Sequence, residues 1–310
     1  MLFHRKNGTP RPMKVHMYDF RWQDSAHAEI QASSGTNFGK KPLSVGSDIS
    51  LEICSDVKCG GSFFNEKWTP CPEKNAGRSK CEICRAREKS FVFTVFDGFN
   101  RESINETDLQ KIAGPHVVYL ALFDKNLIKV GVSKKERKEL RQLEQGSHYT
   151  LFVAETKDGI LARQIETLLR KSGLVDKIKP SQKKGFLCPE IAEKEGEEVL
   201  KTIFESHQKA FKDHALLQNF LAKNPEFVSW KSAYHLSNIE QSAKAFHSVA
   251  LEEGESISGK IISMKGPFLV IETPDELVSV CAKDLLGREI EFEEKPAGLI
   301  LHSAFQSALF

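Results

Sequence analysis

The chain has 310 residues, of which 40% are hydrophobic and 28% charged, so it can fill real cores and is not a disordered chain. Its net charge of +2 hides an asymmetry, because residues 251–310 carry five Lys and Arg against eleven Asp and Glu, which leaves +8 on residues 1–250. No run approaches the roughly 18 apolar residues that cross a bilayer, and the N-terminus lacks a secretory signal, so we expect a soluble, cytoplasmic protein without a membrane partner.

Short β-like runs occupy residues 13–53, where Gly, Ser, Asn and Asp separate them, which predicts a small antiparallel sheet. Residues 54–90 hold five of the seven Cys and almost no apolar periodicity. Such a stretch cannot bury a core of its own, so something other than hydrophobic packing must hold it. We expect an N-terminal β and zinc-binding domain over residues 1–113.

Four cysteines of this stretch have the spacing of a metal site. Cys81 and Cys84 form a C-x₂-C knuckle, in which two thiolates can reach one ion. Cys59 stands beside two glycines and Cys71 beside a proline, which allow the tight turns of a ligand loop. Four thiolates close a tetrahedral shell with no open position, so the sequence predicts a structural Zn²⁺. The spacing leaves Cys54 as the alternative to Cys59.

The character of the chain changes at Gly114 and Pro115. Two apolar, β-branched runs follow, at residues 116–123 and 127–133, with a tight hairpin between them. Then come a charged helix at about 134–144, a third strand at 149–156 and a helix at about 158–171. The order β-β-α-β-α predicts a compact α+β domain over residues 114–188.

The rest of the chain divides into two segments. Residues 189–250 look mostly helical, and residues 251–310 alternate like strands around turns at 265–267 and 274–275. We therefore expect a helical segment and a small C-terminal β domain. The predicted fold class is α+β, with several domains.

The central domain resembles the GIY-YIG domain, the fold of several endonucleases and of nucleotide-excision-repair incision subunits. The runs VVYLALF and LIKVGVS, a later arginine and a glutamate within a helix match that family's pattern. Tyr119 falls on the first tyrosine, Lys129 opens the second motif, Arg141 falls on the arginine and Glu166 on the metal-binding glutamate. The resemblance implies that Tyr119 helps to activate water, that Arg141 balances phosphate charge and that Glu166 holds Mg²⁺ or Mn²⁺.

Two positions depart from the family's pattern. Catalytic members have a tyrosine at the start of the second motif, where this chain has Lys129, which can bind a phosphate but is a poor base unless burial lowers its pKa. Arg141 lies two residues further from Gly131 than is common, which makes Arg137 the alternative.

Tyr119 and Glu166 also have structural interpretations. A strand tyrosine can be a core residue with a satisfied hydroxyl group. Glu166 can pair with Arg163 or Arg170 at helical spacing on a solvated face.

Over roughly residues 15–290 the chain is also similar to an uncharacterised family of bacterial and archaeal zinc proteins. The shared features are a Cys-rich segment with PCP and C-x₂-C, a VYLA…KVG block, an EQG triplet and a GIKG-like strand. They lie here at residues 70–72, 80–84, 118–131, 144–146 and 264–266. This resemblance implies no established activity.

A basic stretch at residues 170–184 favours a polyanionic partner, because it holds six basic side chains against Asp176 alone. We therefore expect a zinc-stabilised protein that binds DNA or RNA. The side chains expected to contact nucleic acid are Arg137, Gln145, Arg170, Lys171, Lys183 and Lys184. Trp22, Trp68 and the pair Phe63 and Phe64 can stack on bases, although aromatic residues of a small zinc domain more often form its core.

Two alternatives stay open. One is an active endonuclease that depends on a divalent metal, with Tyr119, Lys129, Arg141 and Glu166 at its catalytic site. The other is a protein-interaction factor with a vestigial nuclease fold, in which the acidic C-terminal domain contacts a protein partner.

Overall fold

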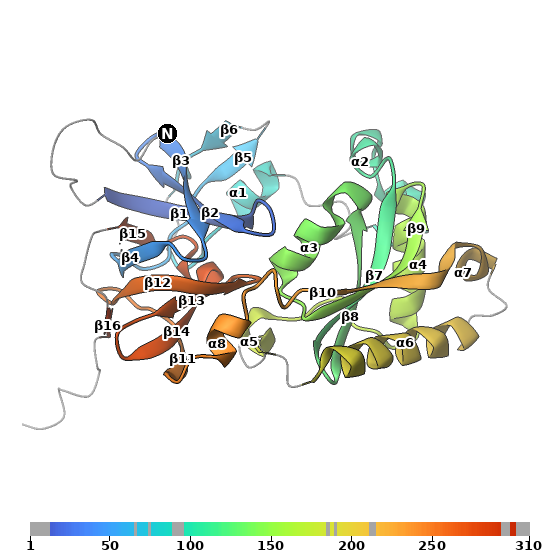
Figure 1. Cartoon of the computed structure of the whole chain (residues 1–310). Helices are drawn as coiled ribbons and strands as arrows, with labels where there is room; N and C mark the ends of the chain where they lie inside the picture. Colours follow the sequence, from blue (N-terminus) through green and yellow to red (C-terminus); the bar gives the residue numbers. More distant parts are fainter. Residues whose placement is uncertain are drawn as a thin grey trace, which may run out of the picture. The chain divides into compact units, whose positions relative to one another are not determined.

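The computed structural model describes residues 13–64, 67–73, 76–88, 96–183, 187–188, 191–210, 215–292 and 298–301, and Figure 1 shows their helices and strands. It is a mixed α+β structure with several sheets, which confirms the predicted fold class. The chain divides into two compact units. Unit 1 comprises residues 1–90 and 235–310, and unit 2 comprises residues 91–234.

Unit 1 is built on a ten-stranded sheet. Its strands follow the order β11-β14-β13-β12-β4-β15-β1-β2-β3, and β16 also pairs with β12. They are β1 (Met13–Trp22), β2 (His27–Ser34), β3 (Asn37–Ser44), β4 (Asp48–Ile53), β11 (Ala245–Val249), β12 (Ser256–Lys265), β13 (Phe268–Glu272), β14 (Glu276–Cys281), β15 (Glu289–Phe292) and β16 (Gly298–Ile300). The smaller elements are β5 (Ser62–Phe64), β6 (Lys67–Thr69), α1 (Glu82–Arg87), α8 (Ser237–Glu240) and the 3₁₀ turn η5 (Ala282–Leu285).

The four-part division expected from the sequence differs from these units. The C-terminal strands share one sheet with the N-terminal strands, because β12 pairs with β4 and β15 pairs with β1 and β4. Residues 91–113 belong to unit 2. Short strands need neighbours to bury their apolar side chains, and pairing over some 200 residues leaves no signal in the local pattern.

Unit 2 holds a four-stranded antiparallel sheet in the order β10-β9-β7-β8. Its strands are β7 (His116–Asp124), β8 (Leu127–Lys134), β9 (Tyr149–Thr156) and β10 (Leu221–Ser229). Its helices and 3₁₀ turns are η2 (Arg101–Ser103), α2 (Glu106–Lys111), η3 (Lys135–Arg137), α3 (Lys138–Gln145), α4 (Gly159–Lys171), α5 (Pro180–Lys183), α6 (Glu193–Ala210) and α7 (Ala215–Phe220).

The β-β-α-β-α order predicted for residues 114–171 is confirmed, and α4 begins where expected. The Asp158 side chain accepts a hydrogen bond from the Leu161 backbone N–H, as an N-cap does. The mostly helical segment expected over residues 189–250 is wrong in part, because residues 221–229 form β10 and residues 245–249 form β11. No helix among the described residues is long and apolar enough to span a membrane.

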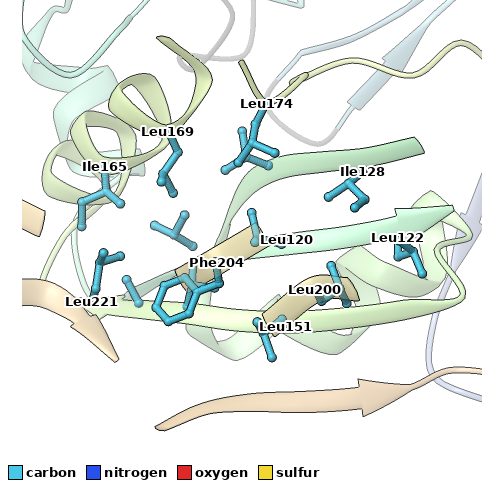
Figure 2. Packing of buried hydrophobic residues seen from close by; sticks show 14 of the residues in the cluster. Leu120, Leu122, Ile128, Leu151, Ile165, Leu169, Leu174, Leu200, Phe204 and Leu221 are labelled. Carbon is cyan, nitrogen blue, oxygen red and sulfur yellow. The ribbon is translucent and has the colours of Figure 1, made fainter. Parts of the chain in front are cut away.

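The core of unit 2 lies on one face of the sheet. Ile165 and Leu169 of α4 point toward Leu120 of β7, and Leu200 and Phe204 of α6 belong to the same cluster (Figure 2). Each such side chain contributes about 1.5–3 kcal/mol when fully buried. Because side chains alternate along a strand, Tyr119 points to the opposite face, where its ring meets Phe152 edge-on.

Candidate functional site

Four buried cysteines of unit 1 form a candidate metal site. The Sγ atoms of Cys59, Cys71, Cys81 and Cys84 all lie within 4.8 Å of one another. Those of Cys71 and Cys81 are 3.8 Å apart. A tetrahedron with metal–sulfur bonds of about 2.3 Å has edges of about 3.8 Å. The cluster could therefore hold a metal such as zinc, with all four positions taken by protein.

Backbone N–H groups around the cluster donate hydrogen bonds to two of the sulfur atoms, which stabilises their thiolate form. Cys81 caps α1, and its Sγ accepts a hydrogen bond from the Cys84 N–H at 3.5 Å. This N–H, together with hydrogen bonds to the other three thiols, lowers the pKa of Cys81 to about 6, whereas burial raises the pKa of Cys59 and Cys84. The Cys59 Sγ in turn accepts from the Cys81 N–H at 3.2 Å. Since the thiolate is the form that binds metal, these hydrogen bonds favour a loaded site.

Cys54 lies outside this cluster. Its thiol donates to the Glu52 carbonyl oxygen at 3.7 Å, and burial raises its pKa. The structure thus groups Cys59, and not Cys54, with the other three cysteines.

Unit 2 brings together a second group, here called the Tyr119 cluster: Tyr119, Lys129, Arg141, Gln145 and Glu166. The Tyr119 side chain is buried, and its oxygen accepts a hydrogen bond from Gln145 Nε2 at 2.5 Å. Burial raises the pKa of Tyr119; Arg141 opposes this rise and Glu166 adds to it. The charge of Lys129 acts on Glu166. The residues that the resemblance singles out therefore lie within electrostatic reach of one another.

Gly131 makes room for the Tyr119 ring. The two residues are paired across β7 and β8, and a Cβ atom at residue 131 would lie 2.5 Å from Tyr119 Cζ and Oη. The ring therefore lies over the bare backbone of β8, the edge strand of the sheet. The φ angle of Gly131 is not positive, so its backbone conformation does not require glycine. Glycine is needed there because any side chain would collide with the Tyr119 ring.

Replacing Gly131 by alanine is expected to lower the free energy of unfolding by about 1–3 kcal/mol, the usual cost of overpacking a buried site. The buried ring cannot move without breaking its hydrogen bond to Gln145. Gly298→Ala is a matched control, because its Cβ would meet open space. Urea unfolding of both variants checks the prediction, and an unchanged midpoint for Gly131→Ala would contradict it.

Glu166 is held by a partner on its own helix. Its carboxylate forms a buried ion pair with Arg163, whose Nε also donates to the Phe96 carbonyl oxygen at 2.8 Å. Burial raises the pKa of Glu166, and the Arg163 guanidinium lowers it. The predicted pairing of Glu166 with Arg163 is present, but the pair is buried and does not lie on a solvated face, while Arg170 pairs with Asp176 at 2.9 Å. A metal ion at Glu166 would compete with Arg163 for this carboxylate.

Arg137 and Arg141 converge on one carboxylate at the surface. Glu144 lies 2.8 Å from Arg137 and 3.4 Å from Arg141 through its two oxygens. The arginine side chains are 53% and 42% exposed, whereas that of Glu144 is 22% exposed. The two arginines that the sequence offers as alternatives thus both pair with Glu144. We call Arg137 and Arg141 together the arginine rim.

The expected basic stretch has mixed roles in the structure. Lys183 donates to the Gln145 carbonyl oxygen at 2.7 Å and lies over the Phe123 ring, so it supports the Tyr119 cluster. Lys171 lies 5.8 Å from the centroid of the Phe99 ring. Lys184 lies outside the described residues.

A buried polar network holds α3, and sequence reasoning missed it. The Tyr234 hydroxyl donates to the Gln142 carbonyl oxygen at 2.9 Å, and Trp230 Nε1 donates to Thr150 Oγ1 at 2.9 Å. Thr150 donates to Gln142 Oε1 at 3.2 Å. These bonds fix the helix that carries Arg141 and Gln145. Their partners lie up to 92 residues apart, so no local pattern could have found them.

Comparison with known proteins gives one family. A family model described as "Protein of unknown function (DUF2797)" matches residues 50–282, a span that includes the four cysteines and the Tyr119 cluster. Neither the curated proteins nor the solved structures contain a match.

Proposed function

Because the chain belongs to the DUF2797 family, whose description names no activity, we propose from its geometry that it is a zinc-stabilised protein that binds nucleic acid through the arginine rim. The observation that carries the proposal is the convergence of two half-exposed guanidinium groups on the Glu144 carboxylate. Carboxylate and phosphate oxygens offer similar acceptor geometry to a guanidinium group. A phosphate of the backbone can take the place of this carboxylate.

The surroundings of the rim favour a polyanion. Residues 134–141 carry five basic side chains against Glu136 and Glu139. Lys183 and Lys129 add positive charge at the Tyr119 cluster of the same unit. Contacts of this kind bind the backbone without reading sequence. The resemblance to the GIY-YIG domain favours the same part of unit 2 as the binding surface, because Arg141 of the rim falls on that family's arginine.

Zinc in this proposal has a structural role in unit 1. Four thiolates leave no position for water or substrate, and tetrahedral sulfur ligation is typical of zinc. The metal would fix the segment of residues 59–84, which has little apolar side chain to bury.

Endonuclease activity is a second candidate function. The observation that favours it is the Tyr119 oxygen, which Gln145 orients beside Arg141. Mg²⁺ or Mn²⁺ would bind Glu166. We place binding first, because Glu166 is paired with Arg163, Tyr119 is 1% exposed, and Lys129 stands where catalytic relatives carry tyrosine.

The double variant Arg137→Gln/Arg141→Gln is expected to weaken binding to DNA or RNA about tenfold or more at low salt. Each lost phosphate contact lowers the slope of log K against log salt by about 0.9, so the slope should fall by nearly 2. Fluorescence anisotropy of labelled strands between 50 and 200 mM salt, roughly the range where such contacts dominate, measures both quantities.

Lys111→Gln/Lys201→Gln is the matched control, because it removes the same charge from α2 and α6 of the same unit. An equal loss in this control, or no binding by the wild type, would overturn the proposal, and the second result would leave a protein-interaction role. Cleavage that needs Mg²⁺ or Mn²⁺ and is lost in Glu166→Gln would establish the second candidate.

A further inference from the structure

Unit 1 contains a cavity of about 350 Å³ beside the cysteine cluster. Its lining includes Tyr18, Asp19 and Arg21 of β1, Phe63 of β5, and Lys80 and Glu88 at the two ends of α1. Lys80 directly precedes the expected metal ligand Cys81. The volume lies at the lower end of the range of small-molecule sites, roughly 300–1,000 Å³.

The charges of the lining are compensated within the protein. The Glu88 carboxylate accepts hydrogen bonds from the Tyr18 hydroxyl group and the Phe63 N–H, and it pairs with Lys80. Asp19 pairs with Arg21 at 2.7 Å. The four charged side chains of the lining thus form two ion pairs and carry no net charge. Such a lining suits a neutral ligand that carries both donors and acceptors.

The apolar part of the lining consists of Leu286 and the rings of Tyr18 and Phe63, all half-buried. Tyr18 and Phe63 meet edge-on with centroids 5.2 Å apart, and Phe38 contacts both rings. Trp68 extends the group, 5.7 Å from Phe38. The pairing of β1 with β2 skips Tyr18, and such a bulge redirects a side chain.

The aromatic residues singled out from the sequence therefore separate into two kinds. Trp22 is a core residue, because it is buried and its Nε1 donates to the Gly266 carbonyl oxygen. Phe63 and Trp68 belong to the half-buried group beside the cavity. The side chain of Phe64 lies outside the described residues.

We infer that this cavity binds a nucleobase, with its ring against Tyr18 and Phe63 and its polar edge toward Arg21, Lys80 and the two carboxylates. The inference rests on the proposed nucleic-acid binding and deepens it, because it names an unpaired base as the ligand. A base inside a duplex has its edge paired and its faces stacked, so only single-stranded or unpaired segments can fill the site. A free nucleotide has the same ring, and the test separates the two sources.

The experiment compares Phe63→Leu with the wild type, both as full-length protein with its metal content verified. Stacking of one base is lost with the aromatic ring, so affinity for a single-stranded oligonucleotide should fall about 5- to 100-fold. Affinity for a blunt duplex should change less than twofold. Phe246→Leu is the matched control, since this phenylalanine lies exposed on β11 of the same unit.

A photo-crosslink locates the base directly. An oligonucleotide with 5-iodouracil, irradiated on the protein and mapped by mass spectrometry, should form adducts at Tyr18, Phe63 or Trp68. Adducts confined to unit 2, with unchanged affinity in Phe63→Leu, would overturn the inference and leave the proposed function intact. Binding of nucleoside monophosphates that Phe63→Leu abolishes, without oligonucleotide binding by the wild type, would support the base site and overturn the proposed function. Binding of neither probe would overturn both.

Discussion

Cys84→Ser is expected to abolish the proposed metal binding and to unfold the cysteine segment of unit 1. In the proposed site the ion replaces a hydrophobic core, because the cluster is formed by four thiols whose neighbours are mostly glycine and polar residues. Structural zinc contributes about 10–16 kcal/mol of apparent binding free energy in small zinc domains, and loss of one thiolate removes a large share of it. Metal analysis and thermal unfolding with and without chelator measure the effect.

Cys54→Ser is the matched control for this variant, because it makes the same chemical change in the same unit outside the cluster. It should keep one equivalent of zinc and a melting temperature close to that of the wild type. Metal loss in Cys54→Ser, together with retention in Cys59→Ser, would show that Cys54 is a ligand. Unchanged metal content and stability in Cys84→Ser would contradict a closed four-thiolate site.

Local signals in the sequence were sufficient for the parts of the fold that depend on neighbouring residues. The hairpin of β7 and β8 follows two β-branched runs with Asp124, Lys125 and Asn126 between them. The N-cap at Asp158 and the apolar stripe of α4 could likewise be read from spacing. In the cysteine segment, the C-x₂-C pair and the turn residues predicted the four grouped thiols, with Cys54 left open as the alternative to Cys59.

Other parts depend on partners that are remote in sequence. Residues 221–229 form a strand because they pair with β9, although the preceding leucine-rich residues favour a helix. The sheet of unit 1 joins β4 to β12, some 200 residues apart. In the candidate site, the sequence offered Arg137 and Arg141 as alternatives, and only the fold shows that both reach Glu144. Nonlocal pairing has no period, so pattern analysis cannot find it.

Arg163→Met is expected to lower the free energy of unfolding of unit 2 by about 3–5 kcal/mol at neutral pH, because it leaves the buried Glu166 carboxylate without its partner. The loss should diminish in acid. Burial already raises the pKa of Glu166 in the folded state, and removal of Arg163, which lowers it, raises it further. The folded state then binds a proton more tightly than the unfolded state, so stability increases as the pH falls through the raised pKa. Urea unfolding at several pH values between about 5 and 8 measures this slope.

The double variant Arg163→Met/Glu166→Gln distinguishes the cost of an unpaired buried charge from the cost of altered side-chain packing. It replaces both ionic groups by neutral side chains of similar size, so most of the stability should return and the pH dependence should flatten. Equal stability of the single and double variants at neutral pH would contradict a buried charge as the cause.

The single variant also tests the second candidate function. Once Arg163 is gone, a divalent ion can neutralise Glu166, so Mg²⁺ should raise the melting temperature of Arg163→Met but not that of the double variant. If Glu166 serves only to pair with Arg163 and cannot bind a divalent ion, Mg²⁺ should leave the melting temperature of Arg163→Met unchanged.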